Sequence, residues 1–214
     1  MQSLEREIDA SGGYLEGTTM ANTFNMLRSN EQIWSYVVNN YRRGKDPTRF
    51  DLLFWNADAT RMHKNVHMFY LRKCYLENAL AEGKMELGGV TLDLSKVKTP
   101  IYLQSSKDDH IAPYRSVYKS THLFGGEINF MVAGSGHIAG VINHPAAGKY
   151  QYWTNPELPG TVEEWWEGTT EHPGPWWDEW ELGLRAKSGD KVAARGAGEG
   201  GWGSLEDARG ALVG

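Results

Sequence analysis

The sequence predicts an α/β fold with parallel strands. Two short apolar runs, "TPIYLQSS" (99–106) and "EINFMVAG" (127–134), have the length of strands, and the first ends in small polar residues. Between them, Pro113 marks a helix start and Gly125 follows the helix end. A strand, a helix and a strand in this order form a right-handed βαβ unit. Functional side chains of such sheets gather at the carboxyl ends of the strands.

Two helices are expected ahead of these strands. Apolar residues recur at helical spacing over 31–42, and Gly44 then ends the helix. A similar pattern over 66–82 predicts a second helix with Gly83 as its C-cap. Both segments could form a lid or cap.

The chain after Tyr150 is rich in tryptophan. Paired tryptophans on short helices either pack these helices onto the sheet, which we favour, or form an exposed interaction patch. The tryptophans of this zone are Trp153, Trp165, Trp166, Trp176, Trp177 and Trp180. The final segment, 184–214, is rich in Gly, Ala and charge and has little to bury, so we expect a disordered tail.

Composition excludes several classes of protein. A chain of 214 residues with 40% hydrophobic residues can bury one sizeable core, and its net charge of -5 gives no basic surface for nucleic acid. The N-terminus lacks the apolar core of a signal peptide, and no apolar run approaches the roughly 18 residues of a membrane span. Cys74 is the single cysteine, so no internal disulfide can form, which suits a reducing cytoplasm.

Asp109 and His137 each come just after a predicted strand. In a triad of nucleophile, histidine and acid, the histidine takes the nucleophile's proton and the acid fixes its tautomer. The α/β-hydrolase order is nucleophile, acid and histidine, and one helix and one strand fit between Asp109 and His137. In the alternative interpretation, Asp109 caps the following helix and His137 is a structural loop residue.

A metal site formed by Asp109, His110, His137 and His144 is a weaker interpretation, because no two of them have the tight spacing of paired ligands.

The nucleophile of such a triad is missing from the sequence. No G-x-S-x-G or G-x-C-x-G elbow occurs, and Ser135 follows the acid instead of preceding it. Cys74 lies inside the predicted second helix, where a lone cysteine is more often a packing residue.

The sequence resembles the C-terminal part of a class I polyhydroxyalkanoate synthase, over about residues 14–183. The resemblance rests on "ANTFNMLRSNEQIWSYVVNNY", "FDLLFWNADATRM", "FYLRKCYLEN", "DLSKVKTPIYLQSSKDDHIAPY", "GSGHIAGVIN", "AAGKYQYWTNPELP" and "WWDEW". It implies the C-terminal part of an α/β-hydrolase fold with its early strands absent. Residues 1–60 would form the cap segment, 61–183 the catalytic part and 184–214 the tail.

The resemblance also implies roles for single residues. Asp109, and not Asp108, corresponds to the catalytic acid of the "DHI" block, and His137 to the histidine of "GHIAG". His110 would be an accessory residue of the same block, with a structural role. His137 would activate a cysteine that lies upstream of this chain. Asp109 would either orient His137 or help to deprotonate the attacking 3-hydroxyl, and the sequence leaves both roles open.

Members of this family polymerise (R)-3-hydroxyacyl-CoA into polyester and release CoA, without a cofactor or a metal. By resemblance we expect a short-chain substrate such as 3-hydroxybutyryl-CoA, a homodimer of the full-length enzyme, and a cytoplasmic location at the polyester granule surface. The chain alone is expected to be inactive, because the cysteine is missing.

Some positions depart from the family, and two other functions stay open. His144 stands where a proline is usual, and Tyr114 where a tryptophan is usual. The alternatives are a polyester depolymerase or esterase on the same scaffold, and a non-catalytic fragment that dimerises or binds granules through its cap.

Overall fold

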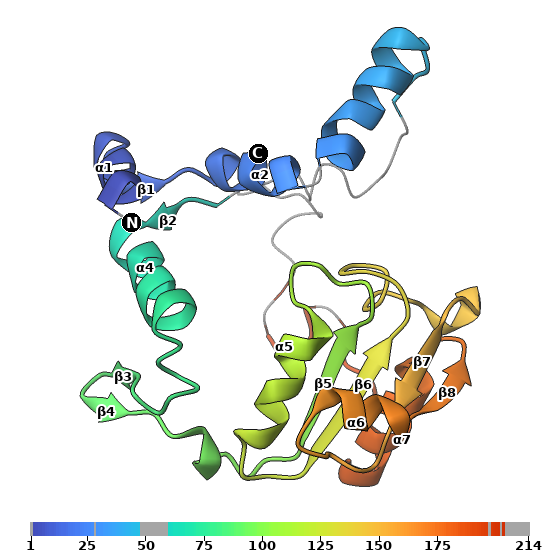
Figure 1. Cartoon of the computed structure of the whole chain (residues 1–214). Coiled ribbons are helices and arrows are strands. Elements are labelled where there is room, and N and C mark those ends of the chain that lie inside the picture. The colour runs from blue at the N-terminus through green and yellow to red at the C-terminus, as the bar shows by residue number, and fades with distance from the viewer. Residues whose placement is uncertain (1, 28, 48–59, 197, 202, 204–214) are drawn as a thin grey trace. The chain divides into compact units, whose positions relative to one another are not determined.

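The computed structural model describes residues 2–27, 29–47, 60–196, 198–201 and 203, which divide into two compact units. The first unit comprises the residues up to Lys98 together with Leu123–Gly126. The second unit comprises Thr99–His122 and the residues from Glu127 onward. Both units combine helices with sheet (Figure 1). The "FDLLFWN" part of the expected cap segment, residues 50–56, and residues 204–214 of the expected tail lie outside the described residues.

The first unit is mainly helical. Its core contains Ile8, Leu15 and Met68, which are buried together. The short strands β1 and β2 pair antiparallel, and Lys64 Nζ lies 2.7 Å from Oδ1 of Asp9. The elements of this unit are α1 (Gln2–Ala10), β1 (Tyr14–Leu15), α2 (Gly17–Leu27), η1 (Asn30–Trp34), η2 (Val37–Arg42), β2 (Met62–His63), α4 (Lys64–Phe69), η3 (Tyr70–Leu76), β3 (Glu86–Leu87), β4 (Val90–Thr91) and η4 (Leu94–Lys96).

The first predicted helix is confirmed, and the second is shorter than predicted. The segment expected over 31–42 is helical as the π-type turns η1 and η2, and Gly44 follows with a φ of 61°. The helix expected over 66–82 ends with η3 at Leu76. Asn78 then turns the chain with a φ of 48°, a conformation that asparagine tolerates. The prediction that Gly83 is the C-cap of this helix is therefore wrong.

The second unit is built on a four-stranded sheet of order β5-β6-β7-β8, seen side by side from green to orange in Figure 1. Its elements are β5 (Ile101–Ser106), α5 (Tyr114–Tyr118), η5 (Lys119–His122), β6 (Ile128–Ala133), η6 (Pro145–Ala147), β7 (Gln151–Thr154), α6 (Val162–Glu167), β8 (Thr170–Pro173) and α7 (Trp177–Lys187).

The predicted βαβ unit is confirmed. β5 and β6 are parallel, with partners from Ile101 and Ile128 at one end to Ser106 and Ala133 at the other. The helical segments α5 and η5 connect the two strands, and α5 begins directly after Pro113, as predicted. The antiparallel strands β7 and β8 were not predicted from the sequence. They extend the sheet beyond β6 and leave β5 as its terminal strand.

Helices pack on both faces of the sheet. Phe130 and Val132 of β6 point to one face, where they form a core with Tyr118 and Trp165 from α5 and α6. Tyr102 of β5 has the opposite parity, and its hydroxyl donates to Oε2 of Glu179 in α7, 3.1 Å away. The sheet is therefore the middle layer between α5 and α6 on one side and α7 on the other.

Trp165 of the short helix α6 is buried, at 0% exposure, which confirms the packing interpretation for this tryptophan. Trp153 is also buried, at 6%, but it lies on strand β7. Thr161 and Glu164 form a capping box at the start of α6, which fixes where Trp165 enters the core.

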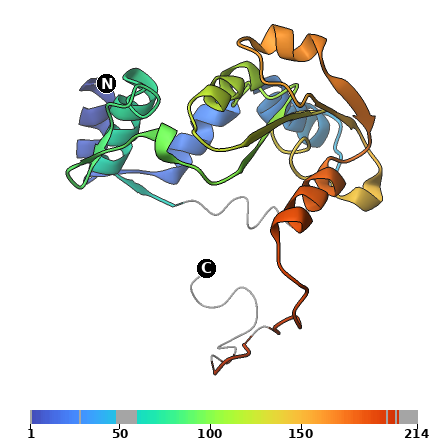
Figure 2. The same cartoon turned by 90° about the horizontal axis from the view of Figure 1, so that it is seen from below.

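The chain beyond α7 contains no helix or strand among its described residues, as Figure 2 shows. α7 itself runs to Lys187, past the boundary expected at 183. In the part of the chain that the structure describes, no helix has both the length and the apolar character to cross a membrane.

Candidate active site

Asp109 lies in the loop that follows β5, and backbone groups fix its carboxylate. Its Oδ1 accepts hydrogen bonds from the backbone N–H groups of Ile111 at 2.8 Å and of Ala112 at 2.9 Å. Only 7% of the side chain is exposed. The helix-capping alternative is wrong: the N-cap of α5 is Pro113, and no side chain caps this helix. Oδ1 of Asp109 instead holds the turn that precedes α5. The other oxygen is left for a different partner.

That partner is His137, from the loop after β6. Its Nδ1 lies 2.8 Å from Oδ2 of Asp109. A carboxylate can only accept, so this contact places the imidazole proton on Nδ1 and leaves the lone pair of Nε2 free. The His137 side chain is 45% exposed, which keeps the ring accessible. The two residues that the sequence singled out are brought together at the carboxyl ends of two parallel strands.

The surroundings of Asp109 favour its charged form. Burial by itself would raise the pKa of this carboxyl, but hydrogen bonds from Ala112, His137 and Ile111 outweigh it and lower the pKa below its ordinary value. Asp109 is therefore ionised at neutral pH. An ionised acid that holds the Nδ1 side of a histidine, with Nε2 turned toward the substrate side, is the arrangement used in general-base catalysis.

The other candidate residues do not join this pair. His110 is exposed and has no hydrogen-bond partner among the described residues. The Nδ1 of His144 accepts from the backbone N–H of Ala146 and so caps η6, while its ring contacts Trp177. The described residues hold no group of three or more His, Cys, Asp or Glu side chains that could bind a metal ion.

The residues that support the His137 loop were not predicted from the sequence. The indole N–H groups of Trp176 and Trp177 donate to the carbonyls of Gly140 and Val141, each at 2.9 Å. Gly140 also packs against Ser106, where a Cβ would come within 2.1 Å of Oγ. The "WWDEW" motif was visible in the sequence, but its contact with the histidine loop depends on how α7 folds back onto the sheet.

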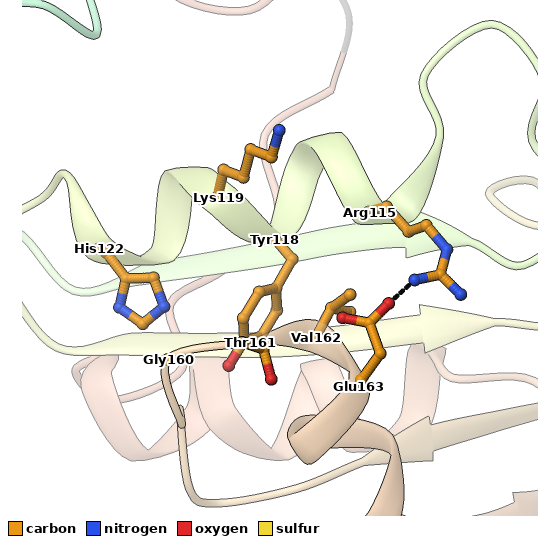
Figure 3. A pocket seen from close by; sticks show the side chains of 8 residues that line it. All are labelled: Arg115, Tyr118, Lys119, His122, Gly160, Thr161, Val162 and Glu163. Atoms are coloured by element: carbon orange, nitrogen blue, oxygen red, sulfur yellow. Dashed lines mark ion pairs between the residues drawn. The ribbon is translucent and has the colours of Figure 1, made fainter.

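A second feature of this unit is a cavity of about 570 Å³ between α5, η5 and the start of α6 (Figure 3). Tyr118 and Val162 line it, and Arg115 forms an ion pair with Glu163 at one end. Neither Asp109 nor His137 lines this cavity. It is therefore separate from the acid–histidine pair.

Comparison with known proteins gives consistent names. The chain is 53% identical over 205 residues to a poly(3-hydroxyalkanoate) polymerase of Methylorubrum extorquens. The matched region covers 95% of this chain and 34% of that protein. It is 47% identical over 213 residues to the poly(3-hydroxyalkanoate) polymerase subunit PhaC of Rhizobium etli, and 44% identical over 196 residues to that of Cupriavidus necator. These matches cover 100% and 88% of this chain, and 33% of each relative. No family model matches the chain. The chain spans about a third of the length of the curated relatives it matches.

Proposed function

This chain is a homologue of the C-terminal part of the poly(3-hydroxyalkanoate) polymerases, and on that premise we propose that it supplies the acid and the histidine of such an enzyme. The enzyme would join (R)-3-hydroxyacyl units from their CoA thioesters into a polyester. The observation that carries the proposal is the 2.8 Å contact between His137 Nδ1 and Asp109 Oδ2. Backbone N–H groups already hold Oδ1 of Asp109, so Oδ2 keeps a fixed direction toward His137. A histidine with only a structural role in the loop would not need an ionised partner that is oriented in this way.

The proposed reaction follows from the tautomer of His137, in which Nδ1 carries the proton and Nε2 can accept one. Nε2 of His137 accepts the proton of a cysteine thiol, and the thiolate attacks the acyl thioester carbonyl. The carbon–sulfur bond to CoA breaks, and the imidazolium returns its proton to the departing CoA thiolate. The 3-hydroxyl of another unit then attacks the acyl-cysteine with His137 as base, which forms the ester and frees the cysteine. The Asp109 contact supports the role of orienting His137 and stabilising its charged form.

The nucleophilic cysteine would come from the portion of the polymerase that this chain does not span. Cys74, the one cysteine of the sequence, belongs to η3 in the other compact unit and follows no strand. A G-x-C-x-G elbow sits at the carboxyl end of a strand of the same sheet as the acid and the histidine. The missing strand should therefore add to the sheet of the second unit.

The edge of β5 offers a place for such a strand. The backbone N–H groups of Ile101 and Lys107 donate to carbonyls on the β6 side, so the backbone groups of Tyr102 and Gln104 face away from β6. No strand among the described residues pairs with that edge. A parallel strand added there would end beside Asp109 and His137. This arrangement supports an α/β-hydrolase fold for the whole enzyme. On the homology alone, we further propose a cap formed by 1–60, a dimer, and action at polyester granules in the cytoplasm.

The proposal is tested by complementation. The chain is co-expressed with the part of the Methylorubrum extorquens polymerase that it does not match, and CoA release from 3-hydroxybutyryl-CoA is measured. We expect CoA release with polymer formation, and a loss of about 10³-fold or more for His137→Ala. Release of free 3-hydroxy acid in place of polymer would point to a hydrolase. No CoA release from a complex that does form would point to a non-catalytic role, and unchanged activity of His137→Ala would refute the assignment of His137.

A further inference from the structure

The loop that carries His137 is a turn in which two backbone carbonyls accept no hydrogen bond from the turn itself. Within it, the N–H of Gly140 donates to Gly136 at 2.9 Å and that of Ile142 donates to Ile138 at 2.8 Å. The carbonyls of Gly140 and Val141 take no part in these bonds. As at the end of a helix, carbonyls left over by a turn need partners from elsewhere, or the turn is free to shift.

Two tryptophans provide these partners. Nε1 of Trp176 donates to Gly140 and Nε1 of Trp177 donates to Val141. Each donor ring has an aromatic neighbour, which for Trp177 is the ring of His144, with centroids 5.9 Å apart. The Trp176 ring stacks on Tyr102 of β5, with centroids 6.0 Å apart and planes inclined by 19°.

The helix that presents these donors is also tied to the sheet. The hydroxyl of Tyr102 donates to Glu179, in the first turn of α7. Tyr102 lies on the same strand that leads to Asp109. The positions of the His137 loop and of the Asp109 loop therefore both depend on the contact between β5 and α7.

We infer that Trp176 and Trp177 are positioning residues, which hold the His137 loop so that Nδ1 stays within hydrogen-bond distance of Asp109. The inference rests on the proposed role of His137 as the general base. The physical reason is preorganisation: a shift of about 1 Å in a catalytic group can lower the rate by roughly 10²-fold. The two indoles act on the loop backbone and do not touch the reacting atoms.

The matched control is Trp180. It lies on α7 with its ring 6.0 Å from that of Trp176, is 38% exposed, and makes no hydrogen bond through Nε1 among the described residues. Replacing each tryptophan with phenylalanine keeps an aromatic ring and removes the N–H group. Trp176→Phe, Trp177→Phe and the double variant thus remove the two donors, and Trp180→Phe removes an indole that does not hold the loop.

The first readout needs no activity. In the chain alone, the titration of the Asp109 carboxyl is followed by ¹³C NMR, with unfolding curves to identify the conditions in which each variant is folded. We expect the pKa of Asp109 to rise toward its ordinary value in the double variant, because the hydrogen bond from His137 is weakened. It should stay unchanged in Trp180→Phe. If the double variant does not fold, the two single variants give the same comparison.

The second readout is kcat in the complemented enzyme. We expect a fall of roughly 10- to 100-fold for the double variant, with KM changed by less than about twofold, and no change for Trp180→Phe. An unchanged Asp109 titration in the folded variants, or an equal rise in Trp180→Phe, overturns the inference. Because the titration does not depend on CoA release, it decides this point even if the proposed function fails.

Discussion

Nδ1 of His137 lies 2.8 Å from Oδ2 of Asp109, and the other oxygen of that carboxylate accepts two backbone N–H groups. One side chain thereby does two things at once: Oδ1 holds the turn before α5, and Oδ2 orients the imidazole. The backbone contacts of Oδ1 thereby fix the direction in which Oδ2 faces the imidazole.

The stability of the second unit should depend on pH through Asp109. A carboxyl whose pKa is lowered by folding stabilises the folded state above its unfolded-state pKa of about 3.9, and this contribution is lost as the pH falls through the folded-state pKa. Asp109→Asn should therefore be less stable than the wild type at neutral pH, and the difference should shrink in acid. Urea unfolding between about pH 7 and pH 2 measures this. Asp108→Asn, an exposed neighbour, is the control, and parallel curves for Asp109→Asn and the wild type would refute the prediction.

Gly140→Ala should destabilise the chain and displace the His137 loop. The added Cβ would lie 2.1 Å from Oγ of Ser106 and 2.8 Å from the carbonyl of Gly136, and both are held in the loop or the strand beside it. We expect the free energy of unfolding to fall by about 1–3 kcal/mol, as for an overpacked core site. Gly160→Ala has open space around the new Cβ and serves as the control. Equal stabilities of the two variants would contradict this account.

Trp165→Ala should cost about 3–5 kcal/mol of unfolding free energy, because a fully buried indole leaves a large cavity among Tyr118, Phe130 and Val132. Trp180→Ala, at a site on α7 that is 38% exposed, should cost clearly less, about 1–2 kcal/mol, because only part of its ring is covered. Chemical denaturation of both variants is the measurement. Similar losses would mean that the tryptophan-rich zone does not pack as described.

Cys74→Ser should leave CoA release by the complemented enzyme within about twofold of the wild type, since the nucleophile is expected elsewhere. In the structure, Cys74 is half-buried in η3 and borders a largely apolar pocket with Val66, Phe69 and Leu80, so its neighbours are those of a small apolar residue. Cys74→Ala is a matched variant that keeps the apolar character. A large loss of activity in both would overturn the packing interpretation of this cysteine.

The sequence predicts the part of the fold that places the acid and the histidine. β5 begins with the apolar run Ile101–Leu103, β6 is apolar except for Asn129, and both strands are bounded by turn residues, so their type and order can be read locally. β7 and β8 have no such pattern. "QYWT" and "TEHP" mix polar and apolar residues, and they become strands because β6 offers an edge and Trp153 reaches the core.

Some residues of the candidate site could not be predicted from the sequence for a similar reason. Asp109 and His137 follow strands and are visible from local spacing, but Trp176 and Trp177 reach the His137 loop only after α7 packs across the sheet. In the first unit, the predicted helix over 66–82 failed at its end, because a single asparagine in a left-handed conformation outweighed the apolar periodicity.

CoA release by the complemented enzyme, compared between Asp109→Asn and Asp108→Asn, tests the central claim most directly. If Asp109 is the acid that orients His137, Asp109→Asn should lose about 10⁴-fold in kcat because the imidazole is held in the wrong tautomer. Asp108→Asn, one residue away and exposed, should retain nearly full activity. Comparable activity of the two variants would contradict the assignment of Asp109 and His137 as the acid and base of this site.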